Sequence, residues 1–196
     1  MSRSGVEISS ETGLGLYPLG RHIAVFGKGG KTTLARAMAR KFDLEFVELD
    51  AIRHLARWEE RADDETRDVL ISRIDAAESG WVTDGNYRVT RDLILDRADT
   101  VVVLALPWKT MVWRTLKRSL IRSFTRQELW NGNRESIRAT FFSRQSVVYD
   151  LWFRRHHFRT IAEEFLVQKP QGVELLIIRT SEELENLYRD FDLIRD

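Results

Sequence analysis

The stretch Ile23-Ala24-Val25-Phe26-Gly27-Lys28-Gly29-Gly30-Lys31-Thr32-Thr33 carries the strongest structural signal in this chain. An apolar run stops at glycine, and Gly-Gly-Lys-Thr-Thr then opens a helical pattern. A strand, a glycine-rich turn and a helix N-terminus in this order form a phosphate-binding loop, because backbone N–H groups and the helix dipole both attract anions. The alternative is a glycine-rich turn that binds no ligand. The candidate phosphate-binding residues are Gly27, Gly29, Gly30, Lys31, Thr32 and Thr33.

The loop is short compared with the standard pattern G-x-x-x-x-G-K-[ST]. Gly27 lies only four positions before Lys31, and Val25 stands where the first glycine is expected. About two missing residues remove up to roughly 7 Å of chain and two N–H donors. Because a charge-assisted hydrogen bond contributes roughly 1.5–3 kcal/mol, we expect weakened nucleotide binding or an altered loop path.

Composition is that of a globular protein, with 43% apolar and 31% charged residues in a chain of 196. The absence of cysteine excludes disulfides and thiolate zinc sites, and a cytoplasmic location is expected. No apolar run is long enough to predict a membrane span. Residues 1–20 are interpreted as a flexible N-terminal leader, and residues 21–196 as one domain.

Charge is concentrated in residues 109–159, which hold twelve Lys or Arg against three Asp or Glu, although the whole chain has a net charge of only +1. Such a segment indicates an anionic partner, either nucleotide phosphates or nucleic acid. The alternative is a solvated helical face. A monomer and a dimer are both compatible with the sequence.

Alternating strand and helix patterns follow the loop, and they predict a three-layer α/β fold: a five-stranded parallel sheet with helices on both faces. The predicted strands are His22–Phe26, Glu45–Leu49, Trp81–Thr83, Thr100–Leu106 and Glu174–Ile178. The predicted helices are Thr32–Lys41, Asp64–Ser79, Val89–Ala98, Trp108–Phe124, Val147–Phe165 and Glu182–Phe191.

Three further motifs resemble nucleotide kinases. The segment Gly80-Trp81-Val82-Thr83-Asp84-Gly85-Asn86-Tyr87-Arg88 is similar to the third-strand motif of adenylate kinases, and Leu49-Asp50-Ala51-Ile52-Arg53 to their second-strand exit. The segment Glu128-Leu129-Trp130-Asn131-Gly132-Asn133-Arg134-Glu135-Ser136, together with Asp-Gly-Asn-Tyr, resembles the adenylate-kinase-like DNA topology modulation proteins. The resemblance covers roughly residues 22–165 and implies a P-loop NTPase fold with a small helical lid at about 119–145.

The resemblance also implies roles for single residues. Lys31 would contact the phosphates, and Asp84 would hold a Mg²⁺-bound water beside the metal ligand Thr32. Arg114 and Arg118 lie four apart on one helix face and would neutralise the transferring phosphoryl group. Asp50, Arg53, Asn86, Tyr87 and Arg88 would bind the acceptor, with the two arginines on an acceptor phosphate.

Each role has a simpler alternative. Asp84 would otherwise cap the next helix, and the arginines would lie on an exposed basic surface. Tyr87 and Trp58 either stack on a base or pack in the core. Because Asp-Gly-Phe-Pro-Arg of adenylate kinases reads Asp-Gly-Asn-Tyr-Arg here, the acceptor need not be AMP.

Four functions compete at this point. The first is a small kinase that uses ATP and Mg²⁺ to phosphorylate a nucleotide or another small acceptor. The second is a nucleic-acid-associated regulator that binds through residues 109–159. The third is a degenerate P-loop protein whose short loop binds nucleotide weakly. The fourth is an ATPase related to nitrogenase iron protein, suggested by Gly27-Lys28-Gly29-Gly30, but the Asp-Gly-Asn-Tyr motif argues against it.

Overall fold

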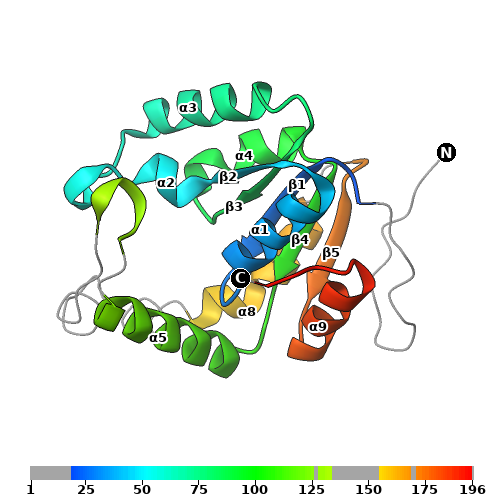
Figure 1. Ribbon diagram of the computed structural model, residues 1–196. Coiled ribbons are helices and arrows are strands. Elements are labelled where there is room, and N and C mark those ends of the chain that lie inside the picture. The colour runs from blue at the N-terminus through cyan, green and yellow to red at the C-terminus, as the bar shows by residue number, and fades with distance from the viewer. Residues whose placement is uncertain (1–18, 126–127, 134–154, 169–170, 196) are drawn as a thin grey trace.

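The computed structural model describes residues 19–125, 128–133, 155–168 and 171–195 (Figure 1). Most of the predicted leader, and residues 134–145 of the predicted lid, lie outside the described residues. Within the described ranges, no helix is both long enough and apolar enough to cross a membrane.

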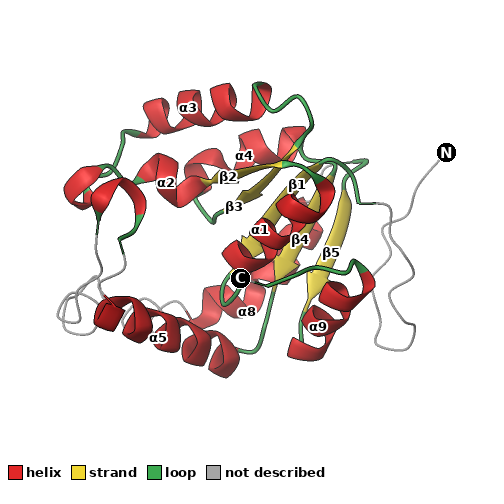
Figure 2. Cartoon of the chain, viewed as in Figure 1, coloured by secondary structure: helices red, strands yellow, loops and turns green. Residues whose placement is uncertain are grey.

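A five-stranded parallel sheet forms the centre of the molecule (Figure 2). The strand order is β2-β3-β1-β4-β5, so β1 is central and carries the glycine-rich loop at its C-terminal end. The strands are β1 (His22–Gly27), β2 (Glu45–Glu48), β3 (Trp81–Asp84), β4 (Thr100–Leu104) and β5 (Glu174–Ile178). The parallel pairing of all five strands confirms the predicted sheet.

Helices cover both faces of the sheet, which confirms the three-layer α/β fold. The described α-helices are α1 (Lys31–Phe42), α2 (Leu49–Arg53), α3 (Asp63–Asp75), α4 (Arg88–Arg97), α5 (Trp108–Thr125), α8 (Arg155–Gln168) and α9 (Ser181–Asp190). Two short 3₁₀ turns, η1 (Ala56–Trp58) and η2 (Trp130–Gly132), complete the described elements.

Alternation along β1 separates two hydrophobic cores. Ile23 and Val25 pack with α1, α9 and the start of α5 on one face. Ala24 and Phe26 pack with α3, α4 and α8 on the other face, where the ring of Phe26 lies 4.5 Å from that of Phe165. Because every second residue of a strand points to the same face, an apolar strand such as β1 supplies both cores at once.

The strand that follows α1 is shorter than predicted. Leu49 was expected to end this strand, but β2 ends at Glu48, opposite Asp84, and Leu49 begins α2. Its side chain packs so closely on Gly85 that a Cβ there would lie 2.3 Å from Leu49 Cδ1. The chain therefore turns away from the sheet where β3 ends.

Large apolar side chains of α5 face solvent in part. Trp113 is 68% exposed and Phe124 is 75% exposed, whereas Met111, Thr115 and Ser119 form the buried side of the helix. The helix is continuous through position 119, where the lid was predicted to begin.

The N-terminus of α9 shows how local sequence fixes a helix start. Thr180 Oγ1 accepts a hydrogen bond from Glu183 N at 3.0 Å, and Glu183 Oε2 accepts one from Arg179 N at 2.7 Å. Thr180→Ala is expected to lower the free energy of unfolding by about 1 kcal/mol, because an N-cap hydroxyl is lost. Urea denaturation checks this, and Thr180→Ser should restore most of the loss; equal stability of all three proteins would contradict it.

Candidate functional site

Three glycines with positive φ shape the turn between β1 and α1. Gly27, Gly29 and Gly30 have φ values of 105°, 81° and 145°. A Cβ on Gly27 would lie 2.2 Å from the carbonyl oxygen of Leu104 in β4, and one on Gly29 would lie 3.3 Å from Met111 Cα. The turn is thus pressed between β4 and α5, and Gly30 caps α1 with no side chain in front of the helix N-terminus.

A buried carboxylate at the end of β3 joins the loop to the sheet. Asp84 is fully buried, and its Oδ2 accepts a hydrogen bond from Thr32 Oγ1 at 2.5 Å and lies 3.3 Å from Lys31 Nζ. Among the described residues, the other oxygen, Asp84 Oδ1, is buried without a hydrogen-bond partner. A buried carboxylate oxygen is costly unless a polar group, ligand or ordered water meets it, so Asp84 Oδ1 is a candidate acceptor for a bound group.

Asn86 holds the first glycine of the loop with both ends of its amide. Its Oδ1 accepts from Gly27 N at 2.9 Å, and its Nδ2 donates to Gly27 O at 2.7 Å. The side chain of Asn86, which was predicted to bind the acceptor, is therefore hydrogen-bonded to the backbone of the loop. This pair of bonds also fixes the next residue, Tyr87, close to the loop.

A cavity of about 560 Å³ opens between the loop, α5 and α9. Of the described residues lining it, five are cationic and one, Glu185, is acidic. The lining consists of Gly29, Gly30, Thr32, Thr33, Arg114, Thr115, Lys117, Arg118, Ile121, Arg122, Leu184, Glu185, Tyr188 and Arg195. This charge balance suits an anion of the size of a nucleotide.

Arg114 connects the two helices that form this cavity. Its Nη1 donates to Gly29 O at 3.1 Å, and its Nη2 lies 3.5 Å from Ser181 Oγ at the start of α9. Arg118 lines the same cavity one helical turn further along α5. The structure thus brings Thr32 and the two predicted lid arginines around one space, while Lys31 lies on Asp84 next to Thr32.

At the far end of this cavity, Arg195 forms two hydrogen bonds of 2.7 Å to Glu185 and lies 4.0 Å from the ring centre of Tyr188. The Arg195 guanidinium lowers the pKa of the Glu185 carboxyl, mainly through its hydrogen bonds. Because these two charges offset each other, the excess positive charge of the cavity comes from α5.

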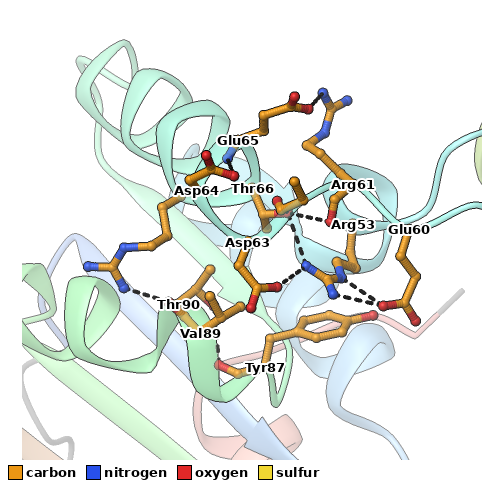
Figure 3. Close-up of polar contacts among 12 residues, drawn as sticks. Arg53, Glu60, Arg61, Asp63, Asp64, Glu65, Thr66, Tyr87, Val89 and Thr90 are labelled. Atoms are coloured by element: carbon orange, nitrogen blue, oxygen red, sulfur yellow. Dashed lines mark hydrogen bonds and ion pairs between the residues drawn. The ribbon is translucent and has the colours of Figure 1, made fainter.

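Arg53, the last residue of α2, is already paired (Figure 3). Its guanidinium forms an ion pair of 2.7 Å with Glu60 and one of 2.6 Å with Asp63, and its side chain is only 15% exposed. Arg88, by contrast, begins α4 on the surface. The two arginines predicted to bind one acceptor phosphate therefore have different surroundings.

Asp50 and Tyr87 meet directly. Tyr87 Oη donates to Asp50 Oδ1 at 2.7 Å and lies 3.1 Å from His54 Nε2. Because the hydroxyl gives its one proton to Asp50, the second bond needs the proton of His54 Nε2. Burial, followed by the negative charge of Asp50, raises the pKa of Tyr87 far above its ordinary value, so the phenol stays protonated.

Two tryptophans flank His54: Trp58, which was expected either to stack on a base or to pack in the core and is 41% exposed, and Trp130, to which no role was assigned. Trp58 and Trp130 have ring centres 5.5 Å and 6.0 Å from that of His54. The Asn-Gly-Asn motif fixes this arrangement, since buried Asn133 accepts from Trp58 N at 2.8 Å and donates to Leu55 O at 2.7 Å. The Trp-Asn-Gly-Asn sequence was the one available sign of this cluster. Residue spacing does not reveal that it packs on the segment containing Leu55 and Trp58.

Comparison with known proteins adds little to this description. No family model matches the chain, and no curated protein matches it. A crystal structure described as an unliganded sugar kinase from Janibacter sp. HTCC2649 aligns over 90% of this chain and 96% of that chain, with 18% identity and a TM-score of 0.41. The fold is therefore established by the sheet order and layers, and kinship with adenylate kinases and topology modulation proteins stays a prediction from the motifs.

Proposed function

We propose that this protein transfers the γ-phosphate of ATP, with Mg²⁺, to a small acceptor. The observation that carries the proposal is buried Asp84, which binds Thr32 and Lys31 while its Oδ1 has no partner among the described residues, beside a cationic cavity of about 560 Å³. A phosphate chain with its metal would give Asp84 Oδ1 a partner, and its negative charge would balance the cationic side chains that line the cavity.

The donor set fits Mg²⁺, which prefers carboxylate, hydroxyl and phosphate oxygens and keeps several waters. Thr32 Oγ1 and Asp84 are oxygen donors at one point of the loop. Bound there, the ion would neutralise charge on the β- and γ-phosphates.

The protein's own groups would position the reaction. The N–H groups at the start of α1 would hold the phosphates, and Lys31, released from Asp84, would contact the same oxygens. Arg114 and Arg118 would compensate the charge that spreads over the γ-phosphoryl oxygens during transfer. The nucleotide would occupy the space between α5 and α9, and the acceptor would approach from the side of β2 and β3.

An ADP-release assay with nucleosides, nucleotides and sugars as acceptors tests the proposal. We expect acceptor-dependent ADP formation that requires Mg²⁺. Binding of ATP without acceptor-dependent release for any compound would instead favour a degenerate protein that keeps the loop but has lost turnover.

Arg114 provides a graded test of the cavity. Arg114→Ala is expected to weaken ATP binding about tenfold, because one charge-assisted contact of roughly 1.5 kcal/mol is lost and the Gly29 carbonyl loses its donor. Isothermal titration calorimetry of wild type, Arg114→Ala and Arg114→Lys measures the effect. Retention of wild-type affinity in the alanine variant would place the nucleotide elsewhere.

The short loop can be tested by lengthening it. Two residues inserted between Gly27 and Gly29 are expected to raise ATP affinity at least about tenfold, because they restore N–H donors to the turn. The same calorimetric titration checks this, with an equal insertion beside Gly172, where a Cβ has no neighbour within 4 Å, as the control. An unchanged affinity would mean that the loop functions as it is.

Nucleic-acid binding through residues 109–159 remains a second proposal. Arg126, Arg134, Arg138 and Arg144 of this segment lie outside the described residues, while Arg114, Arg118 and Arg122 line the cavity. Binding to a phosphate backbone would weaken steeply with salt and would not need Mg²⁺.

A further inference from the structure

On the proposed acceptor side of the site, the Asp50 carboxylate is held by a hydrogen bond to one of its two oxygens. Asp50 follows β2 directly and lies in the first turn of α2, where it is partly exposed. Its Oδ1 accepts the Tyr87 hydroxyl bond, and within the described part of the chain Oδ2 has no hydrogen-bond partner. Asp50 can therefore accept one further hydrogen bond without breaking an existing one.

This carboxylate is tied to the phosphate loop. Tyr87 binds Asp50 with its hydroxyl, and the preceding residue, Asn86, binds Gly27 through two hydrogen bonds. All three segments leave the sheet at its C-terminal edge, where the ends of parallel strands converge. Asp50 thus follows β2, on one side of β1 in the sheet, whereas α5 and α9 follow β4 and β5 on the other side.

The charges around Asp50 do not favour a phosphorylated acceptor. Arg53, predicted to grip an acceptor phosphate, is balanced by Glu60 and Asp63 (Figure 3). A phosphate group would have to displace a carboxylate from Arg53 and would then lie beside both Glu60 and Asp63, one of them no longer paired. With Asp50 itself, three carboxylates face this region, and like charges at short range repel.

An aromatic wall completes the region. His54, Trp58 and Trp130 contact one another, with ring centres 5.5–6.4 Å apart, and Trp58 is 41% exposed. Aromatic faces bind the apolar faces of ring-shaped molecules, and the adjacent Asp50 would accept hydrogen bonds from hydroxyl groups. A carboxylate that can bind a hydroxyl group, Asp50, therefore lies next to aromatic rings that can bind the ring of an acceptor.

We infer that the acceptor is an uncharged ring compound bearing a hydroxyl group, and that Asp50 accepts the hydroxyl proton during transfer; this rests on the proposed function. The acceptor oxygen forms a bond to the γ-phosphorus as the bond from that phosphorus to the β–γ bridging oxygen breaks. ADP leaves with the electron pair of the broken bond, and the proton moves from the hydroxyl to Asp50 and then to solvent. Tyr87 acts as a positioning residue that orients the carboxylate.

Matched acceptor pairs test the inference. Adenosine and AMP, thymidine and TMP, and glucose and glucose 6-phosphate are offered with Mg-ATP, and the products are identified by mass spectrometry. We expect phosphorylation of at least one unphosphorylated member and of none of its phosphorylated partners. Turnover confined to phosphorylated members, or no turnover of any neutral member while Mg-ATP binds, would overturn the inference.

Variants of the acceptor side then assign the role. Asp50→Asn keeps an oxygen that can accept the Tyr87 bond, so folding should be unchanged while kcat falls about 10²–10⁴-fold, the usual contribution of a general base. Tyr87→Phe should lower kcat about tenfold with little change in the KM for ATP. Asp96→Asn, an exposed exchange on α4, is the matched control. A wild-type kcat in Asp50→Asn would refute the role of Asp50 as general base. If the wild-type protein does not bind Mg-ATP at all, the proposed function itself is refuted.

Discussion

Replacing Lys31 with methionine is expected to lower phosphoryl transfer from ATP by at least about a hundredfold, the usual effect of removing one group that stabilises the transferring charge. Lys31 Nζ lies 3.3 Å from Asp84 Oδ2 and only 14% of its side chain is exposed, so it is held at the loop before any ligand arrives. Steady-state ADP release with the best acceptor measures the change in kcat/KM.

Loss of folding must be separated from loss of chemistry in this variant. Lys31→Met alone leaves the buried Asp84 carboxylate without its ion pair, which costs about 3–5 kcal/mol in comparable cases. The double variant Lys31→Met with Asp84→Asn removes both charges, so its thermal stability should recover while its activity stays low. Recovery of activity together with stability would show that Lys31 acts only on folding.

Gly27→Ala is expected to lower the free energy of unfolding by at least about 3 kcal/mol, since overpacking and backbone strain each cost roughly 1–3 kcal/mol. The added Cβ would lie 2.2 Å from the Leu104 carbonyl oxygen, and φ at this residue is 105°. Because the clash is with the backbone of a central strand, no side chain can move to relieve it. Chemical denaturation and the melting temperature report the effect.

Gly172 provides the matched control for this prediction. It also has positive φ, at 87°, but a Cβ there meets no atom of the described residues within 4 Å. Gly172→Ala should therefore show only the conformational cost, about 1–2 kcal/mol. Equal losses at the two positions would mean that Leu104 does not constrain the loop.

The sheet could be predicted because its strands are apolar on both faces. Runs such as Thr100–Leu104 are buried throughout, so they stand out from the charged helices without any knowledge of their partners. The ends were harder to predict. Leu49 belongs to α2 because β2 loses its partner where β3 ends, and that is a property of the neighbouring strand.

The proposed donor half of the site was open to sequence reasoning because it lies in one local motif. Gly27 to Thr33 are consecutive, and Asp84 ends a recognisable strand. The structure brings Thr32, Lys31 and Asp84 together, while their role in binding phosphate stays a prediction.

The proposed acceptor half depends on contacts between distant segments. Asn133 holds Trp58 across 75 positions of sequence, and Tyr87 meets Asp50 across 37. A single sequence contains no spacing rule for such pairs. Glu60 and Asp63 lie only 7 and 10 positions from Arg53, but their pairing depends on how the chain turns between α2 and α3, which residue spacing does not reveal.

Calorimetric titration of the wild-type protein with ATP, with and without Mg²⁺, tests the central claim most directly. Saturable one-to-one binding that strengthens with Mg²⁺ and disappears in Lys31→Met is the predicted result. Absence of binding at millimolar Mg-ATP, or binding indifferent to both Mg²⁺ and Lys31, would contradict the assignment of this loop as a nucleotide site.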